Sequence, residues 1–202
     1  MNLFIDSETT GLINYDLPID APEQPHIVQL AAILTEDDAA CTVCETFQAV
    51  IKPDGWTIGE DAYKVHGLSL DHALAVGLPA EEVLREFFSL VTRAVQSTEH
   101  ARAIGHNLPF DTRMVMREVY AHPHVRVRER ISDLLPFCTM RALTPICRLP
   151  SRHRRSDFKW PSLIEAHRYC FDTDLPDAHT ALGDALAARA IFVEGRKRGW
   201  WR

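Results

Sequence analysis

The first 52 residues contain three short apolar runs with no helical pattern between them. Residues 3–6, 27–34 and 45–52 have the length and composition of β-strands, and a Pro-Asp-Gly turn at 53–55 ends the third run. Strands that follow one another without a helix pair in antiparallel fashion, because a parallel pair needs a long crossover connection. This part of the chain therefore predicts a three-stranded antiparallel meander. The proline-rich, acidic stretch 13–26 between the first two runs is expected to be an extended loop beside a site.

In the remaining sequence, helical and strand-like patterns alternate. Helical apolar spacing at 79–95 and 109–120 flanks a strand at 101–105. Three antiparallel strands followed by alternating helices and strands predict a mixed sheet with helices on its faces, an α/β architecture. With 202 residues, of which 46% are hydrophobic, the chain is expected to form a single domain over 1–202. The other elements expected are a strand at 134–140 and helices at 161–169 and 177–198.

Composition and charge restrict the compartment and the partners. The five cysteines are odd in number and no secretory signal precedes them, which favours a cytoplasmic protein without a disulfide framework. Cys41 and Cys44 form a CxxC pair, but no second pair follows at zinc-site spacing, so a zinc or redox site is the weaker interpretation. No apolar run approaches the ~20 residues of a membrane span, so no membrane association is expected. The net charge of −6 argues against a nucleic-acid partner unless some carboxylates hold divalent cations.

Asp6 and Glu8 lie two residues apart where the first strand ends. In an extended chain, alternate side chains point to the same face, so both carboxylates address one site. Like charges this close raise each other's pKa unless a cation lies between them, and hard cations such as Mg²⁺ or Mn²⁺ prefer oxygen ligands. The pair therefore indicates either a metal site or a solvated turn, since acids and threonines commonly end strands.

Two further segments carry candidate site residues. Asp111 follows the strand at 101–105 through a short loop, where α/β proteins often build their sites, although an acid is also favoured in the first turn of a helix. His179 and Asp184 are five residues apart, a rotation of about 140° in an ideal helix. If Asp177 caps the terminal helix, His179 lies in the first turn, where the helix dipole keeps imidazole neutral and able to accept a proton, and Asp184 reaches inward. Taken alone, the histidine fits a surface position on a helix better.

Together these segments resemble the DEDDh exonucleases, the DnaQ-like family that includes proofreading subunits of replicative polymerases and ribonuclease T. The matching motifs are FIDSETTGL at 4–12, GHNLPFD at 105–111 and HTALGD at 179–184, in the order of the family and with the His-x4-Asp spacing of its histidine subclass. VHGLS at 65–69 and KWPSLIEAHRYCF at 159–171 add weaker similarity. The resemblance implies a ribonuclease H-like fold, in which a mixed sheet of three antiparallel strands and then parallel strands is flanked by helices.

The resemblance also implies an exonuclease that shortens single-stranded nucleic acid from its 3′ end and releases nucleoside 5′-monophosphates. Carried over residue by residue, Asp6, Glu8, Asp111 and Asp184 would hold two divalent cations, Mg²⁺ or Mn²⁺, and His179 would activate the attacking water. In two-metal phosphoryl transfer, one ion lowers the pKa of the water and the other, ~3.5 to 4 Å away, stabilises the departing oxygen. DNA is favoured as the substrate, because the first motif and VHGLS look more like the proofreading branch.

Five neighbouring residues are candidates for contacts with the terminal nucleotide, on the pattern of similar enzymes. The Thr9 backbone and the Leu12 side chain are expected to meet its sugar and base, Asn107 and Phe110 to flank the same pocket, and His66 to approach the 3′ end. Each also has a purely structural interpretation: a turn threonine, a core leucine, a loop asparagine, a core phenylalanine, and a capping or buried histidine.

A basic run at 152–155 (RHRR), with Lys159 and Trp160 close behind it, is the candidate for guiding a nucleic-acid strand. A solvated loop with a core tryptophan is the alternative and is slightly favoured.

Three other functions compete with a DNA exonuclease. They are an RNA-trimming exoribonuclease similar to ribonuclease T, a polymerase-docking module in which catalysis is secondary, and a hydrolase of small phosphodiesters. The complete set of four carboxylates and one histidine argues against a pure scaffold. The expected partner is the 3′ end of single-stranded DNA or RNA, a DNA polymerase is a second candidate, and a monomer or homodimer is expected.

Overall fold

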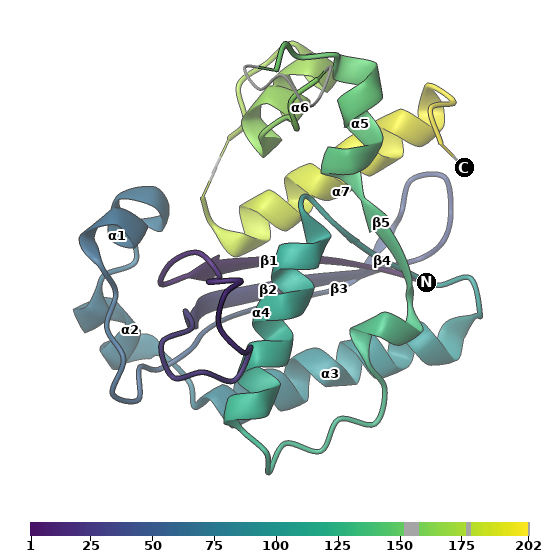
Figure 1. Cartoon of the computed structure of the whole chain (residues 1–202). Helices are drawn as coiled ribbons and strands as arrows, with labels where there is room; N and C mark the ends of the chain where they lie inside the picture. The colour runs from purple at the N-terminus through teal and green to yellow at the C-terminus, as the bar shows by residue number, and fades with distance from the viewer. Residues whose placement is uncertain (152–157, 177–178, 202) are drawn as a thin grey trace.

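The computed structural model describes residues 1–151, 158–176 and 179–201 (Figure 1). Its centre is a five-stranded sheet in the order β3-β2-β1-β4-β5. β1 pairs with β2 and β2 with β3 in antiparallel fashion, and β4 and β5 continue the sheet in parallel with β1. The predicted α/β mixed sheet is therefore confirmed. The strands are β1 (Asn2–Thr9), β2 (Ile27–Thr35), β3 (Val43–Val50), β4 (Arg102–Gly105) and β5 (Leu135–Cys138).

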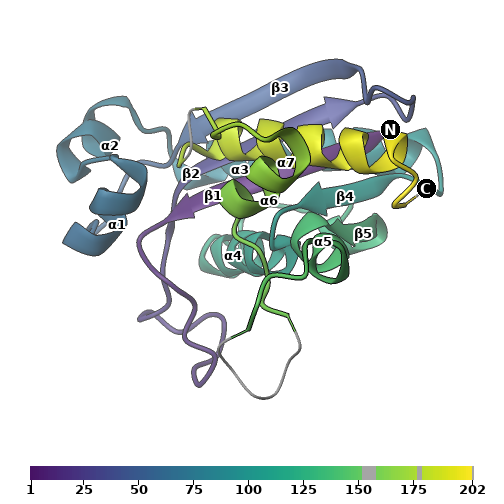
Figure 2. The same ribbon diagram turned by 90° about the horizontal axis from the view of Figure 1, so that it is seen from above.

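Helices cover both faces of this sheet, as Figures 1 and 2 show. α7 (Ala181–Lys197) lies across one face and packs on β1 and β2, with α5 (Thr139–Cys147) and α6 (Leu163–Phe171) beside it. α3 (Ala80–Ser97) and α4 (Leu108–Ala121) cover the other face. Because β2 lies between the two layers, every residue of this strand is buried, which explains why it is apolar except at Gln29 and Thr35.

Three helices were not expected from the sequence. α1 (Glu60–His66) and α2 (Leu70–Val76) follow β3 and lie together at one end of the sheet (Figure 2). Both have only seven residues, too few to show a clear helical period. The strand expected at 134–140 ends at Cys138, where α5 begins, and a short 3₁₀ turn (Ile131–Asp133) precedes it.

Local capping moves the starts of the last two helices. Ser162 caps α6: its hydroxyl oxygen accepts a hydrogen bond from the Glu165 N–H, and the Glu165 carboxylate accepts one from the Ser162 N–H, so α6 begins at Leu163. Thr180 caps α7 by accepting from the Gly183 N–H. The expected helix start at 177 is therefore wrong, and α7 begins at Ala181.

None of the helices in the described part of the chain is long and apolar enough to cross a membrane.

An aromatic cluster anchors α7 to the sheet. The Phe192 ring lies in edge-to-face contact with Phe4 of β1 and Phe137 of β5, at centroid distances of 5.8 and 4.9 Å.

We expect Phe192→Ala to lower the free energy of unfolding by about 3 to 5 kcal/mol, because it removes a fully buried ring and leaves a cavity. Urea denaturation measures the change. Leu186→Ala on the same helix is the control, since that side chain is 42% exposed and its loss should change stability much less. Equal losses in the two variants would contradict this description of the core.

Candidate active site

Asp6 and Glu8 lie on the face of β1 that is covered by α7. Side chains alternate along the strand, so these carboxylates share a face with Phe4, whose ring contacts Phe192 of α7. The first turn of α7 supplies Asp184 to the same place. Oxygen atoms of Asp6, Glu8 and Asp184 all lie within 4.8 Å of one another. The pairing expected for Asp6 and Glu8 is thus present, with a third carboxylate beside it.

Asp111 reaches the same region from α4, on the opposite face of the sheet. Ser7, which points away from Asp6 and Glu8, donates its hydroxyl hydrogen bond to Asp111 Oδ1 at 2.7 Å. The approach depends on Gly105, because a Cβ at that position would lie 2.9 Å from the Ile5 carbonyl oxygen. The chain therefore leaves β4 tightly against β1, and Asp111 follows in the first turn of α4, only 3% exposed.

A glutamine that the sequence did not single out fixes the start of α7. Gln29 lies opposite Glu8 in the β1–β2 register, and its side-chain oxygen accepts from the Ala181 N–H at 2.9 Å. Both groups are buried, so this hydrogen bond satisfies one of the free N–H groups of the helix terminus. It ties the first turn of α7 to the sheet beside Glu8.

The pKa values of the four carboxyl groups are all raised above their ordinary values. Burial and the neighbouring Asp111, Asp184 and Glu8 raise the pKa of Asp6 well above its ordinary value. Burial, with Asp184, raises the pKa of Glu8 to about 7. Burial also raises the pKa of Asp111 to about 7, against the hydrogen bond from Ser7, and raises the pKa of Asp184. Acids that are pressed together and desolvated in this way form the oxygen donor set that hard divalent cations prefer, so the residues fit such ions.

His179 lies outside α7, not in its first turn. It precedes the capping residue Thr180 and has a left-handed backbone with φ of +70°. Its N–H donates to Asp184 Oδ1 at 3.2 Å, and its side chain is exposed. The expected cap, Asp177, lies outside the described residues. The histidine is nonetheless held next to Asp184, at the rim of the acidic cluster.

A cleft of about 820 Å³ opens beside Glu8, between the end of β1, α1 and the start of α4. Four of the five residues expected to contact the terminal nucleotide line it. Asn107 is not among the described residues that line the cleft. It occupies the N-cap position of α4 and has a left-handed backbone with φ of +74°. Its expected contact with the substrate stays a prediction. The residues of helix α1 in these walls were missed, because α1 itself was not expected. The four expected residues are Thr9, Leu12, His66 and Phe110, and the added wall residues of α1 are Glu60, Asp61, Ala62 and Val65.

His66 is 7% exposed, and its two ring nitrogens have different surroundings. Its Nδ1 accepts from the Leu68 N–H at 3.0 Å, which leaves the ring proton on Nε2. Nε2 faces the Thr9 backbone but makes no hydrogen bond of good geometry within the described residues. A buried donor in this state is what a ligand in the cleft would satisfy.

The mixed sheet with helices on both faces is a ribonuclease H-like α/β fold, and it carries an acidic cluster at the end of β1. A family model for exonucleases, named RNase T, matches residues 3–192, and the chain therefore belongs to this exonuclease family. A comparison with curated proteins found no match.

Solved structures of exonuclease I share the fold. Exonuclease I of E. coli in complex with a dT13 oligonucleotide is similar with a TM-score of 0.72 and 20% identity, over 98% of this chain and 41% of that one. The moderately thermophilic exonuclease I from Methylocaldum szegediense is similar with a TM-score of 0.69 and 19% identity, over 98% and 40%. The chain thus spans about two fifths of the length of these proteins.

The raised pKa values predict how the metal-free protein responds to pH. Glu8 and Asp111 have folded-state pKa values of about 7, above their ordinary values near 4, so the folded state binds more protons than the unfolded chain between these limits. The free energy of unfolding should therefore fall as pH rises through that window. Thermal unfolding in chelator at pH 5 and pH 8 measures this, and Glu8→Gln should reduce the difference.

Divalent cations should restore the stability that the metal-free protein loses as pH rises. Mg²⁺ or Mn²⁺ at a hundredfold excess over its Kd should raise the Tm at pH 8 by roughly 5 to 10 °C, and less at pH 5, where protons compete for the carboxylates. The control is buffer without divalent cations, brought to the same ionic strength with a Na⁺ salt. A shift that is the same at both pH values would contradict a carboxylate site.

Proposed function

We propose that this chain is a metal-dependent 3′-to-5′ exonuclease that removes nucleoside 5′-monophosphates from the 3′ end of single-stranded nucleic acid. The observation that carries the proposal is the meeting of Asp6, Glu8 and Asp184 within 4.8 Å, with Asp111 and His179 beside them. These are the five residues of the family's three motifs, and they come from β1, α4 and the N-terminal side of α7. The match to the exonuclease family over residues 3–192 supports the same reaction.

In the proposed site, Asp6, Glu8, Asp111 and Asp184 would hold two divalent cations, Mg²⁺ or Mn²⁺. When bound, the ions supply Lewis acidity toward the attacking water and the scissile phosphate. Ser7 orients the Asp111 carboxyl group through its 2.7 Å hydrogen bond, and Gln29 positions the start of α7. Asp6, Glu8 and Asp184 already present carboxylate oxygens within 4.8 Å of one another.

His179 is the proposed general base. It is exposed, so it can meet water and substrate, and its backbone is tied to Asp184 at the rim of the cluster. It also lies just before the amino end of α7. In this role its imidazole accepts the proton that the attacking water loses.

The cleft beside Glu8 is the proposed binding site of the terminal nucleotide. Leu12 and Phe110 offer apolar surface for its base, and the His66 Nε2–H offers a hydrogen bond to its sugar. Binding there satisfies the buried donor of His66 and presents the last phosphodiester to the carboxylates.

Single-stranded DNA is the preferred substrate in this proposal. The exonuclease I structures that share the fold include complexes with oligonucleotides such as dT13. RNA is the competing substrate, as for ribonuclease T, and the choice depends on which group meets the 2′ hydroxyl. We further propose that residues 1–202 form one exonuclease domain. The cytoplasmic location, the polymerase partner and the monomeric or dimeric state stay predictions.

The activity test uses matched 5′-labelled single-stranded DNA and RNA oligonucleotides with Mg²⁺, Mn²⁺ or chelator. We expect stepwise shortening from the 3′ end that requires metal, with DNA shortened faster. His179→Ala and Asp184→Asn should each lower kcat by about 10² to 10⁴, because one removes the base and the other a ligand. His124→Ala, which changes an exposed histidine far from these residues in sequence, is the control and should keep full activity. Folded protein that shortens neither strand under any metal would overturn the proposed function.

A further inference from the structure

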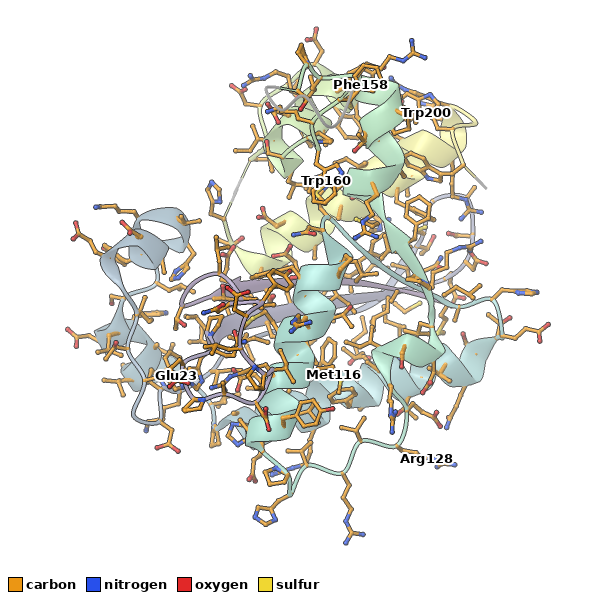
Figure 3. All side chains as sticks on the ribbon, viewed as in Figure 1. Glu23, Met116, Arg128, Phe158, Trp160 and Trp200 are labelled. Carbon is orange, nitrogen blue, oxygen red and sulfur yellow. The ribbon has the colours of Figure 1, made fainter. Side chains whose placement is uncertain are left out.

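A second cleft, also of about 820 Å³, lies along the outer face of α4. Its walls are the loop after β1, the length of α4 from Leu108 to Tyr120, and the segment that leads through β5 into α5. Figure 3 labels Met116 on α4, which lines this cleft, and Trp160 near α5. The function proposed above does not use this cleft.

Positive charge distinguishes the lining. Among the described residues that line the cleft, Arg113 and Arg141 are the only charged ones, whereas the whole chain has a net charge of −6. Neither arginine forms an ion pair with a carboxylate in the described part of the chain, unlike Arg117 or Arg168. The Arg113 Nε is buried and has no hydrogen-bond partner within the same described residues. Unpaired guanidinium groups in a concave surface suit phosphate groups, which they bind in bidentate fashion.

Each of these arginines lies over an exposed aromatic ring. The Arg113 guanidinium carbon is 5.1 Å from the centroid of Tyr15, which is 71% exposed. The Arg141 guanidinium carbon is 6.0 Å from the centroid of Trp160, which is 61% exposed. The tryptophan is thus not a core residue, contrary to the favoured sequence interpretation, and the basic run at 152–155 lies outside the described residues. Aromatic rings beside cations are the surface on which single-stranded bases stack, because every base has a π-face.

The second cleft adjoins the cleft beside Glu8, since the two clefts share two walls. The loop after β1 gives Leu12 to the cleft of the terminal nucleotide and Tyr15 to the second cleft. The first turns of α4 give Phe110 to the former and Thr112 and Arg113 to the latter, on either side of Asp111 in sequence.

The backbone next to Trp160 is tied to the loop between β4 and α4. The Pro161 carbonyl oxygen accepts from His106 Nε2 at 2.9 Å, and His106 belongs to the loop that joins β4 to α4. His106 Nδ1 lies 3.0 Å from Thr139 Oγ1, so the ring also contacts the start of α5. The same loop therefore positions both Asp111 and the segment that carries Trp160.

We propose that the second cleft binds the single-stranded substrate upstream of its terminal nucleotide. Arg113 and Arg141 neutralise backbone phosphates, and Tyr15 and Trp160 stack on bases. This inference rests on the proposed function, because it assigns the path of the strand that the acidic cluster shortens. The terminal nucleotide occupies the first cleft, so only substrates longer than a few nucleotides reach the second.

The test compares a dithymidine dinucleotide with a 12-residue oligothymidylate as substrates. Arg113→Gln with Arg141→Gln should lower kcat/KM on the 12-mer about tenfold, through KM, and should leave the dinucleotide unchanged. The slope of log kcat/KM against log salt on the 12-mer should fall by about 0.7 for each arginine removed. Trp160→Ala should weaken 12-mer binding about tenfold with little change in the salt slope. Arg126→Gln, an exposed arginine outside the cleft, is the matched control and should keep both rates.

Several outcomes would overturn the proposal. Unchanged rates and salt slopes on the 12-mer, with dinucleotide hydrolysis intact, exclude the cleft while the proposed function stands. Equal losses on both substrates also exclude it, because they place the effect in the catalytic site or in folding, and thermal unfolding separates those two. Altered self-association in sedimentation with unaltered 12-mer binding would assign the cleft to a second copy of the chain. A wild-type protein that hydrolyses neither substrate would overturn the proposed function, and the cleft assignment with it.

Discussion

The mutual repulsion of four desolvated carboxylates is the constraint around which this molecule is organised. Asp6 and Asp111 are buried enough for their pKa values to rise, and Glu8 and Asp184 add further negative charge at the same place. No single strand or helix would hold such a group together in water. The arrangement persists because it is attached to a sheet buried on both faces, whose hydrophobic stabilisation far exceeds the local repulsion.

The layers of the fold explain how acids distant in sequence come together. β1 presents Asp6 and Glu8 to the α7 face and Ser7 to the α4 face, so alternation along one strand addresses both layers at once. Phe192 packs on Phe4 and fixes how α7 crosses the sheet. The aromatic core and the active site are therefore not independent, since the same strand positions both.

Much of this could be predicted from the sequence, and the failures have physical causes. Apolar runs predicted the five strands of the described residues, and helical spacing predicted four of the seven α-helices described there, because burial of one or two faces determines where apolar residues occur. The short helices α1 and α2 were not predicted, because seven residues form too few turns to reveal a helical spacing of apolar residues. The position of His179 was predicted wrongly for another reason. Thr180 and Asp177 are both residue types that cap helices well, and only tertiary contacts such as that of Gln29 with Ala181 decide between them. Ser7 was hidden in the same way, since its role depends on a partner 104 residues away.

An acidic site that receives a polyanion faces an electrostatic conflict, and the distribution of charge around α4 bears on how it is resolved. Divalent cations can neutralise the carboxylates, but they act only at the last phosphodiester. The rest of a strand would still approach a chain with a net charge of −6. Most arginines here are paired with acids or carbonyl groups, as Arg117 and Arg189 are. Arg113 and Arg141 instead face aromatic rings in the second cleft, whose described lining residues include no carboxylate. Local positive charge at that place lets a negatively charged protein hold a long anion while its catalytic carboxylates stay reserved for cations.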